Sequence, residues 1–234
     1  MYPDDCLQSI ISSDWWVEDE QPTLSRGALI FAFAPHVDQL PYTFEPIGRS
    51  NAEEHGSATI RVAPLKVDKP LQQTDLPVAA MTLHHNEVWA AYRAKKRPCL
   101  VLGSKSPSVD SSLTRGKPNS ATAPTILAAP YYGVDQNGRR AGYRPEFVER
   151  VRHCEYPQFV WDKLPVAGPD ESILRLDHLQ PLGAHVKACN LTKYRLNEEA
   201  LQLIDDLLKW MIWGGVEEES LLVLYRQIIE DTFR

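Results

Sequence analysis

Long hydrophobic runs are missing from this sequence. The longest, from Ala28 to Pro35, is far shorter than the ~20 residues that a membrane-spanning helix needs. The first residues include Asp4 and Asp5 and show no basic stretch followed by an apolar one, so no secretory signal is visible. We therefore expect a soluble, cytoplasmic protein without a membrane partner.

Cysteine is scarce, and the signature motifs of common enzyme classes are absent. The four cysteines, Cys6, Cys99, Cys154 and Cys189, are widely spaced and form no C-x-x-C pair, which excludes zinc-ribbon and thioredoxin-type sites. The sequence contains no G-x-S-x-G, H-E-x-x-H, G-x-x-x-x-G-K-[ST] or G-x-G-x-x-G motif. We expect reduced cysteines, no metal and no cofactor.

A basic excess is also missing. The formal net charge is −6 and the isoelectric point is near 5.7, which argues against a protein that coats nucleic acid non-specifically. A local basic groove stays compatible with this charge. Hydrophobic residues make up 43% and charged residues 24% of the 234 residues, which is typical of a globular protein with a sizeable core.

Short apolar runs and helical periodicities alternate irregularly along the chain. Strands are predicted at 27–34, 58–67, 99–102, 125–132 and 172–182. Helices are predicted at 84–96, from Pro145 onward, at 197–213 and at 217–233. Residues 36–57 are expected to form a loop, and residues 104–124, which are rich in Gly, Pro, Ser and Thr, a mobile loop. This order predicts an α+β fold, a small twisted sheet or barrel flanked by helices.

Two charges in the last predicted strand stand out. Arg175 and Asp177 are two residues apart, so on a strand they leave the same face. One interpretation is an ion pair on a wet face. The other is a guanidinium and a carboxylate aimed into one groove, where the arginine fork matches two phosphate oxygens.

Several segments, in their order, resemble the PemK/MazF-like toxins of bacterial toxin–antitoxin systems. Residues 26–31 (RGALIF) are similar to the strand that opens those proteins, and residues 97–102 (RPCLVL) to the family's Arg-Pro-x-Leu-Val-Leu strand. Residues 126–130 (ILAAP) stand where the family has an apolar strand ending at a proline. Residues 172–180 (SILRLDHLQ) resemble its strand with Ser, Arg-x-Asp and Gln, and Arg195-Leu196 with the following helix resembles its closing segment.

The resemblance divides the chain into three parts. Residues 1–26 are a lead-in, residues 27–213 are a PemK/MazF-like barrel with its closing helix, and residues 214–234 are an extra C-terminal helix. Insertions are expected at 35–96, 103–124 and 133–165. The implied fold is a small SH3-like β-barrel.

The resemblance also implies an activity, the metal-independent cleavage of single-stranded RNA through attack by the 2′-hydroxyl. The implied catalytic residues are Arg175, Asp177 and His36. The implied substrate-binding residues are Arg97, Lys96 and Ser172. The implied partners are single-stranded RNA, an antitoxin protein and a second copy of the chain. The alternative is a non-catalytic barrel that binds a protein or RNA, because a fold can outlive its chemistry.

Overall fold

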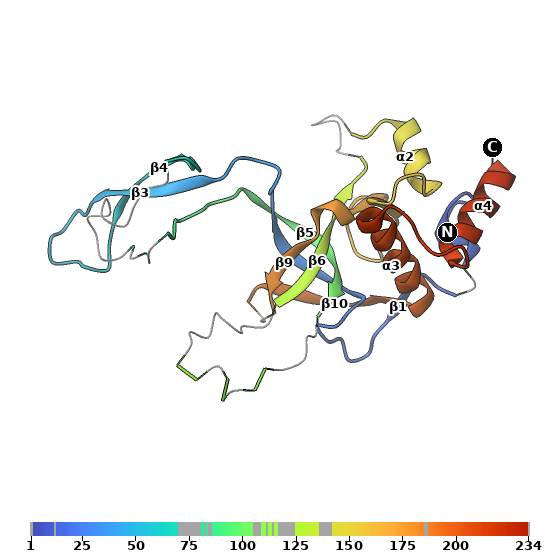
Figure 1. Ribbon diagram of the computed structural model, residues 1–234, viewed down its shortest axis with the longest axis horizontal. Coiled ribbons are helices and arrows are strands. Elements are labelled where there is room, and N and C mark those ends of the chain that lie inside the picture. The colour runs from blue at the N-terminus through green and yellow to red at the C-terminus, as the bar shows by residue number, and fades with distance from the viewer. Residues whose placement is uncertain are drawn as a thin grey trace. The chain divides into compact units, whose positions relative to one another are not determined.

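The structure is a computed structural model (Figure 1). It describes residues 2–11, 13–69, 81, 83, 86–104, 109–110, 112–113, 115–116, 125–135, 142–184 and 187–233. The helices are α1 (Leu7–Ile10), α2 (Pro145–Arg152), α3 (Glu198–Trp213) and α4 (Leu221–Phe233). The strands are β1 (Trp16–Glu18), β2 (Ala28–Pro35), β3 (Tyr42–Gly48), β4 (Thr59–Pro64), β5 (Ala94–Gly103), β6 (Thr125–Gly133), β7 (Phe159–Asp162), β8 (Ser172–Arg175), β9 (Gln180–Gly183) and β10 (Cys189–Leu196).

The chain forms two compact units, one of residues 1–33 and 96–234 and one of residues 34–95. The smaller unit contains the antiparallel hairpin of β3 and β4, in which Glu45 pairs with Arg61. Ile60 and Val62 are 43% and 57% exposed. The loop predicted over 36–57 is therefore wrong at β3, whose residues form a strand because β4 supplies their pairing partner.

The helix predicted over 84–96 is also wrong, as far as the described residues reach. Residues 86–93 contain no helix, and residue 94 begins β5. Ala91 bonds through its N–H and its carbonyl to Tyr42, at 2.6 and 2.8 Å, so its backbone is paired across the chain and not along a helix. Tertiary pairing has overridden the helical periodicity.

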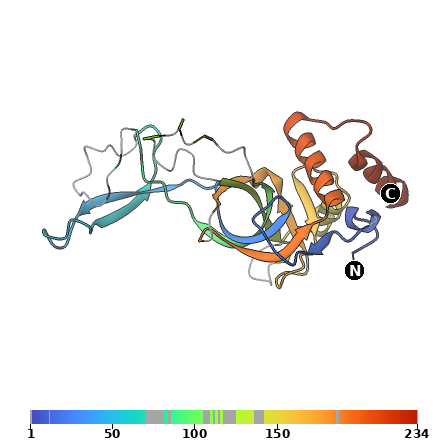
Figure 2. The ribbon, with the colours of Figure 1, turned by 90° about the horizontal axis from the view of Figure 1, so that it is seen from below.

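The larger unit is built on one eight-stranded sheet. The strands follow the order β1-β10-β2-β5-β6-β8-β7, with β9 also paired to β6. Figure 2 shows this sheet strongly curled, but the pairing of the described strands runs as an open path from β1 to β7. The predicted α+β class is confirmed, whereas a closed SH3-like barrel is not formed by these pairings.

The strand predicted over 172–182 is interrupted. β8 ends at Arg175 and residues Leu176–His178 form a 3-10 turn before β9 begins. β8 pairs with the end of β6, through Tyr131↔Leu174, and β9 pairs with its beginning, through Thr125↔Gly183. The turn thus shifts the pairing register on β6, because Ala128 pairs with Gln180, whereas an unbroken strand that pairs Leu174 with Tyr131 would place residue 177 there.

The segments before and between the predicted strands also contain structure. The lead-in forms α1 and β1, and β1 pairs with β10, a strand that the sequence did not predict. Trp15 is 2% exposed, so it packs onto the body of the protein. The segment 133–165 contains α2 and β7. Most of the mobile loop predicted over 104–124 lies outside the described residues.

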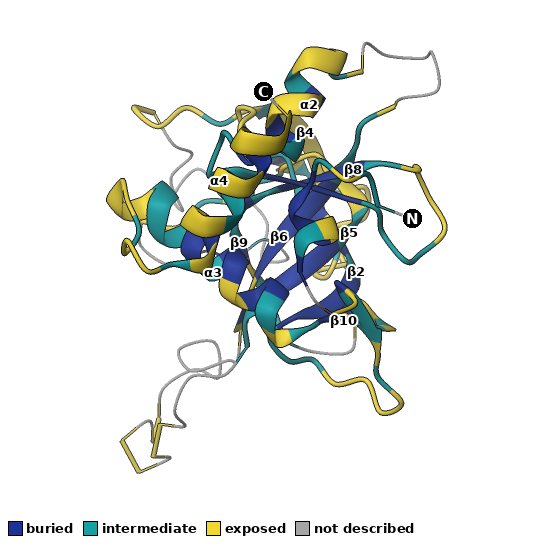
Figure 3. Cartoon of the chain, turned by 90° about the vertical axis from the view of Figure 1, so that its right-hand side faces the viewer, coloured by how far each residue is buried: buried dark blue, intermediate teal, exposed yellow. Residues whose placement is uncertain are grey.

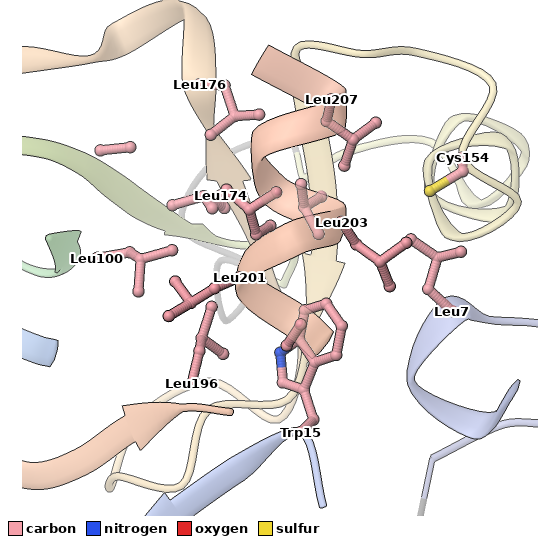
Figure 4. Close-up of a cluster of buried hydrophobic side chains, with 14 of the residues drawn as sticks. Leu7, Trp15, Leu100, Cys154, Leu174, Leu176, Leu196, Leu201, Leu203 and Leu207 are labelled. Carbon is pink, nitrogen blue, oxygen red and sulfur yellow. The ribbon is translucent and has the colours of Figure 1, made fainter. Parts of the chain in front are cut away.

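The C-terminal helices complete the core. Asn197 caps α3 by accepting a 2.7 Å hydrogen bond from the Ala200 N–H, and Gly214, at φ 80°, ends the helix in the left-handed conformation. Leu222 and Ile229 of α4 are buried with the core, while outward-facing parts of α3 and α4 are exposed (Figure 3). Figure 4 shows the core cluster, which includes Leu7, Trp15, Leu100, Leu174, Leu176, Leu196, Leu201, Leu203 and Leu207.

Candidate functional site

Arg175 lies at the centre of a polar cluster where β8 enters the 3-10 turn. Its Nε donates to Asp177 Oδ1 at 2.7 Å and its Nη2 donates to Asp177 Oδ2 at 2.6 Å. The same Nη2 lies 2.8 Å from His178 Nε2. The turn therefore places Asp177 and His178, which would leave opposite faces of a continuous strand, against one guanidinium.

Tyr132, near the end of β6, joins this cluster to β5. Its hydroxyl is 2.8 Å from His178 Nδ1, so the imidazole is held between the tyrosine and Arg175. The Arg97 guanidinium lies over the Tyr132 ring at 3.9 Å from its centroid, and that of Arg175 at 5.7 Å. We call Arg97, Tyr132, Arg175, Asp177 and His178 the arginine cluster.

The charges of the cluster are partly screened from water. The side chain of Arg175 is 20% exposed and that of Asp177 is 32% exposed. Burial opposes the charge of Arg175, but the hydrogen bonds and charge of Asp177, together with a hydrogen bond to Tyr143, raise the pKa of its guanidinium above the usual value. The arginine therefore remains a fixed cation.

The geometry agrees in part with each of the two interpretations of Arg175 and Asp177, the surface ion pair and the phosphate-binding groove. The two side chains form a closed bidentate pair, as an ion pair on a wet face would. They also lie beside a second arginine, a histidine and a tyrosine, which a simple surface pair would not need. A cavity of about 590 Å³ in the same unit is not lined by the arginine cluster. Its lining residues are Asp135, Lys163, Gly168, Pro169, Asp170 and Glu171.

The remaining predicted site residues lie apart from the arginine cluster or in another unit. Lys96 neighbours Arg97 on β5, where successive side chains point to opposite faces, and its Nζ lies 5.8 Å from the Phe31 ring centroid. Ser172 begins β8 and is 2% exposed. His36 belongs to the smaller unit, where its N–H bonds to the Arg93 carbonyl at 2.8 Å. The roles predicted for these three residues stay predictions.

Sequence reasoning did not single out His178 or Tyr132. His178 directly follows Asp177, but a strand continuing to residue 182 would have turned it away from Arg175. Pro181, which disfavours a regular strand, lies inside β9 opposite Leu127 and so did not mark the break. Tyr132 could only be found through the pairing of β6 with β8, which no local pattern specifies.

Among the described residues, no three histidine, cysteine or acidic side chains gather as ligands for a metal ion. Within the same residues, no helix has the length and apolarity to span a membrane. His84 and His85, two neighbouring histidines of the sequence, lie outside the described residues. No family model, characterised protein or solved structure matches this chain.

Proposed function

We propose that this protein is a metal-independent endoribonuclease that cleaves single-stranded RNA at the arginine cluster. The observation that carries the proposal is the contact of one Arg175 guanidinium with both Asp177 and His178. Arg175, which can bind a phosphate, is thereby in hydrogen-bond contact with two side chains that can transfer protons. The segment resemblance to PemK/MazF-like toxins supports the same activity.

The reaction needs three contributions that these side chains can supply. A base removes the proton of the ribose 2′-hydroxyl, and the 2′-oxygen then bonds to phosphorus. Arg175, assisted by Arg97, stabilises the negative charge of the crowded phosphate. The bond from phosphorus to the 5′-oxygen breaks, a protonated group gives its proton to that oxygen, and a 2′,3′-cyclic phosphate remains.

His178 is the better placed of the two proton-transfer candidates. Asp177 has both carboxylate oxygens bound to Arg175, an arrangement that fixes the orientation of the arginine. Histidine exchanges protons near neutral pH, and Tyr132 and Arg175 fix the ring of His178. We assign proton transfer to His178 and orientation of the clamp to Asp177. His36 stays a further candidate for proton transfer.

The finer fold and the partners belong to the same proposal. The curled, mostly antiparallel sheet supports an SH3-like barrel of the PemK/MazF type. An antitoxin protein and a second copy of the chain are its expected protein partners. Binding of a protein or RNA without catalysis is the second candidate function. The closed Arg175–Asp177 pair weighs against cleavage, because the scissile phosphate must displace Asp177 from the guanidinium.

The test compares RNA cleavage by the wild type and four variants in the presence of EDTA. Arg175→Ala removes the clamp and should slow cleavage by ~10²–10³, and Arg175→Lys should recover only part of the rate because lysine lacks the bidentate fork. His178→Asn should slow turnover with little effect on RNA binding. Arg61→Ala is the control, since Arg61 also pairs with a carboxylate, at 2.5 Å from Glu45, but lies in the smaller unit.

The outcomes separate the two candidate functions. Cleavage that depends on Arg175 and His178 but not on Arg61 supports the endoribonuclease. A folded wild type that binds RNA, loses affinity in Arg175→Ala and never cuts would establish the binding module instead. A wild type that neither binds nor cuts RNA would contradict both.

A further inference from the structure

Four aromatic side chains around α2 form a continuous stack that begins beside Arg175. The Tyr143 and Phe147 rings are stacked at 5.2 Å between centroids, and Phe147 and Tyr156 at 5.9 Å. Phe159, the first residue of β7, meets Phe147 edge-on at 5.4 Å and Tyr156 at 6.2 Å. We call Tyr143, Phe147, Tyr156 and Phe159 the aromatic ladder.

Guanidinium groups lie against both parts of the ladder. The Arg175 guanidinium is 5.0 Å from the Phe159 ring centroid, and that of Arg150 is 5.1 Å from the Tyr156 centroid. Hydrogen bonding between Tyr143 and Arg175 contributes to the raised pKa of that arginine. The four rings therefore contact one another directly, with one guanidinium group against Phe159 and another against Tyr156.

Core packing explains only the inner side of the ladder. All four rings are half-buried, and they pack inward on Val148, Val151, Trp161 and Ile173. Each flanking guanidinium also pairs with a carboxylate, Arg175 with Asp177 and Arg150 with Glu155, both at 2.6 Å. Tyr143 is the terminal ring of the stack and precedes α2, so it is the ring best placed to receive another flat group.

We propose that the aromatic ladder is a base-binding extension of the arginine cluster, in which Tyr143 stacks on the base of the nucleotide whose phosphate contacts Arg175. An aromatic ring hydrogen-bonded to a phosphate-binding guanidinium matches the base and phosphate of one nucleotide, because bases stack on aromatic side chains while the backbone meets positive charge. The ligand must be single-stranded, because the bases of a duplex already have both faces stacked. The inference rests on the proposed function for its ligand, single-stranded RNA.

Binding is measured with a short mixed-sequence RNA carrying 2′-O-methyl groups, which cannot supply the attacking hydroxyl. Tyr143→Leu removes the ring and keeps an apolar side chain, and it should weaken binding about tenfold. The dependence of affinity on salt should not change, since no phosphate contact is lost. Tyr194→Leu is the matched control, because Tyr194 is also half-buried and lies 5.2 Å from the Lys193 ammonium, but on β10.

A second probe keeps the test valid if Tyr143→Leu folds poorly. The same RNA with one base removed at successive positions should bind the wild type about tenfold more weakly at one position. Tyr143→Leu should lose nothing further at that position, because two changes to one contact are not additive. Tyr143→Trp, which keeps an aromatic face, should bind the intact RNA at least as tightly as the wild type.

Each result bears on the two proposals separately. Equal affinities for the wild type and Tyr143→Leu, with weaker binding by Arg175→Ala, would overturn the ladder and leave the proposed function standing. Weaker binding by Tyr143→Leu, with no cleavage of unmodified RNA by the wild type, would support the ladder and contradict the endoribonuclease. A wild type that does not bind the RNA would overturn the ladder.

Discussion

Asp162 is the clearest case of one residue organising several segments. It is 0% exposed, and its carboxylate accepts hydrogen bonds from Trp15 at 3.2 Å, Trp16 at 3.2 Å, Tyr131 at 3.1 Å and Tyr2 at 3.3 Å. The donors come from the N-terminal segment and from β6. The buried carboxylate therefore ties Tyr2, Trp15 and Trp16 of the N-terminal segment to the sheet.

The pKa of Asp162 gives this interaction a pH dependence. Burial raises the pKa from 3.8 to about 6, against the opposing effect of the hydrogen bonds. Between pH 4 and pH 6 the folded state therefore binds more protons at Asp162 than the unfolded state. The sign of the linkage follows: this group adds about 3 kcal/mol to the free energy of unfolding as the pH falls through that window.

The comparison of wild type with Asp162→Asn measures this contribution. We expect the free energy of unfolding in urea to differ more between the two proteins at pH 4.5 than at pH 7.5, because only the wild type gains stability by binding a proton there. Asp110→Asn, in which the exposed Asp110 is replaced, controls for the change of net charge. A difference that is constant or larger at pH 7.5 would show that the folded state does not raise this pKa.

At the scale of single elements, α4 illustrates how burial and exposure divide one helix. Leu222 is 1% exposed and Leu224 is 53% exposed, although both are leucines near the start of the same helix. The Ser220 hydroxyl also donates to the buried Asp206 of α3, at 2.6 Å, which fixes the beginning of α4 against α3. We interpret residues 214–234 as part of the core and not as a separable appendage.

Leu222→Ala should lower the free energy of unfolding by about 2–5 kcal/mol, because it removes a buried side chain and leaves a cavity. Leu224→Ala changes the same residue type at an exposed position and should stay within about 0.5 kcal/mol of the wild type. Urea unfolding of the two variants gives the comparison directly. Equal destabilisation would mean that α4 does not pack on the core in solution.

The elements that the sequence predicted well are those with local signals. α3 begins at an asparagine cap and ends at a left-handed glycine, and β2 lies between a glycine and a proline, so both could be placed from their own residues. The failures depend on partners distant in the sequence. Residues 94–96 join β5 because β2 and β6 pair with that strand, and the break after Arg175 follows from the two registers that β8 and β9 adopt on β6.

The residues of the candidate site were likewise predictable only where the signal is local in the sequence. Arg175, Asp177 and Arg97 could be chosen from spacing and resemblance, because charged residues at regular positions are visible in a sequence. His178 and Tyr132 could not be chosen, since their contacts arise from a turn and from a strand register. A histidine one residue beyond a predicted pair is informative only when the local backbone geometry is known.

At the scale of the whole molecule, the arginine cluster and the aromatic ladder belong entirely to the larger unit. Residues 34–95 form a unit of their own. This unit is inserted between β2 and β5, which are neighbouring strands of the sheet. The His36 N–H bonds to the Arg93 carbonyl at 2.8 Å, so the two ends of the insertion are already close.

Replacement of residues 37–92 by an Asn-Gly turn should therefore leave the larger unit folded, because a two-residue loop closes neighbouring antiparallel strands. We expect cooperative thermal unfolding and RNA cleavage that is retained in the shortened protein. His36→Ala in the same background tests that residue alone. Loss of cooperative unfolding would contradict the independence of the larger unit, and loss of cleavage with an intact fold would assign the smaller unit a part in the site.

The central claim, RNA cleavage by the arginine cluster through the 2′-hydroxyl, is tested most directly by the chemistry of the products. Wild-type protein is incubated in EDTA with a single-stranded RNA and with the same sequence made with 2′-deoxy sugars. We predict that only the RNA is cut, that its products end in a 2′,3′-cyclic phosphate, and that Arg175→Ala forms them ~10²–10³ more slowly. Cleavage of the deoxy strand, or no cleavage of RNA by the folded wild type, would contradict the claim.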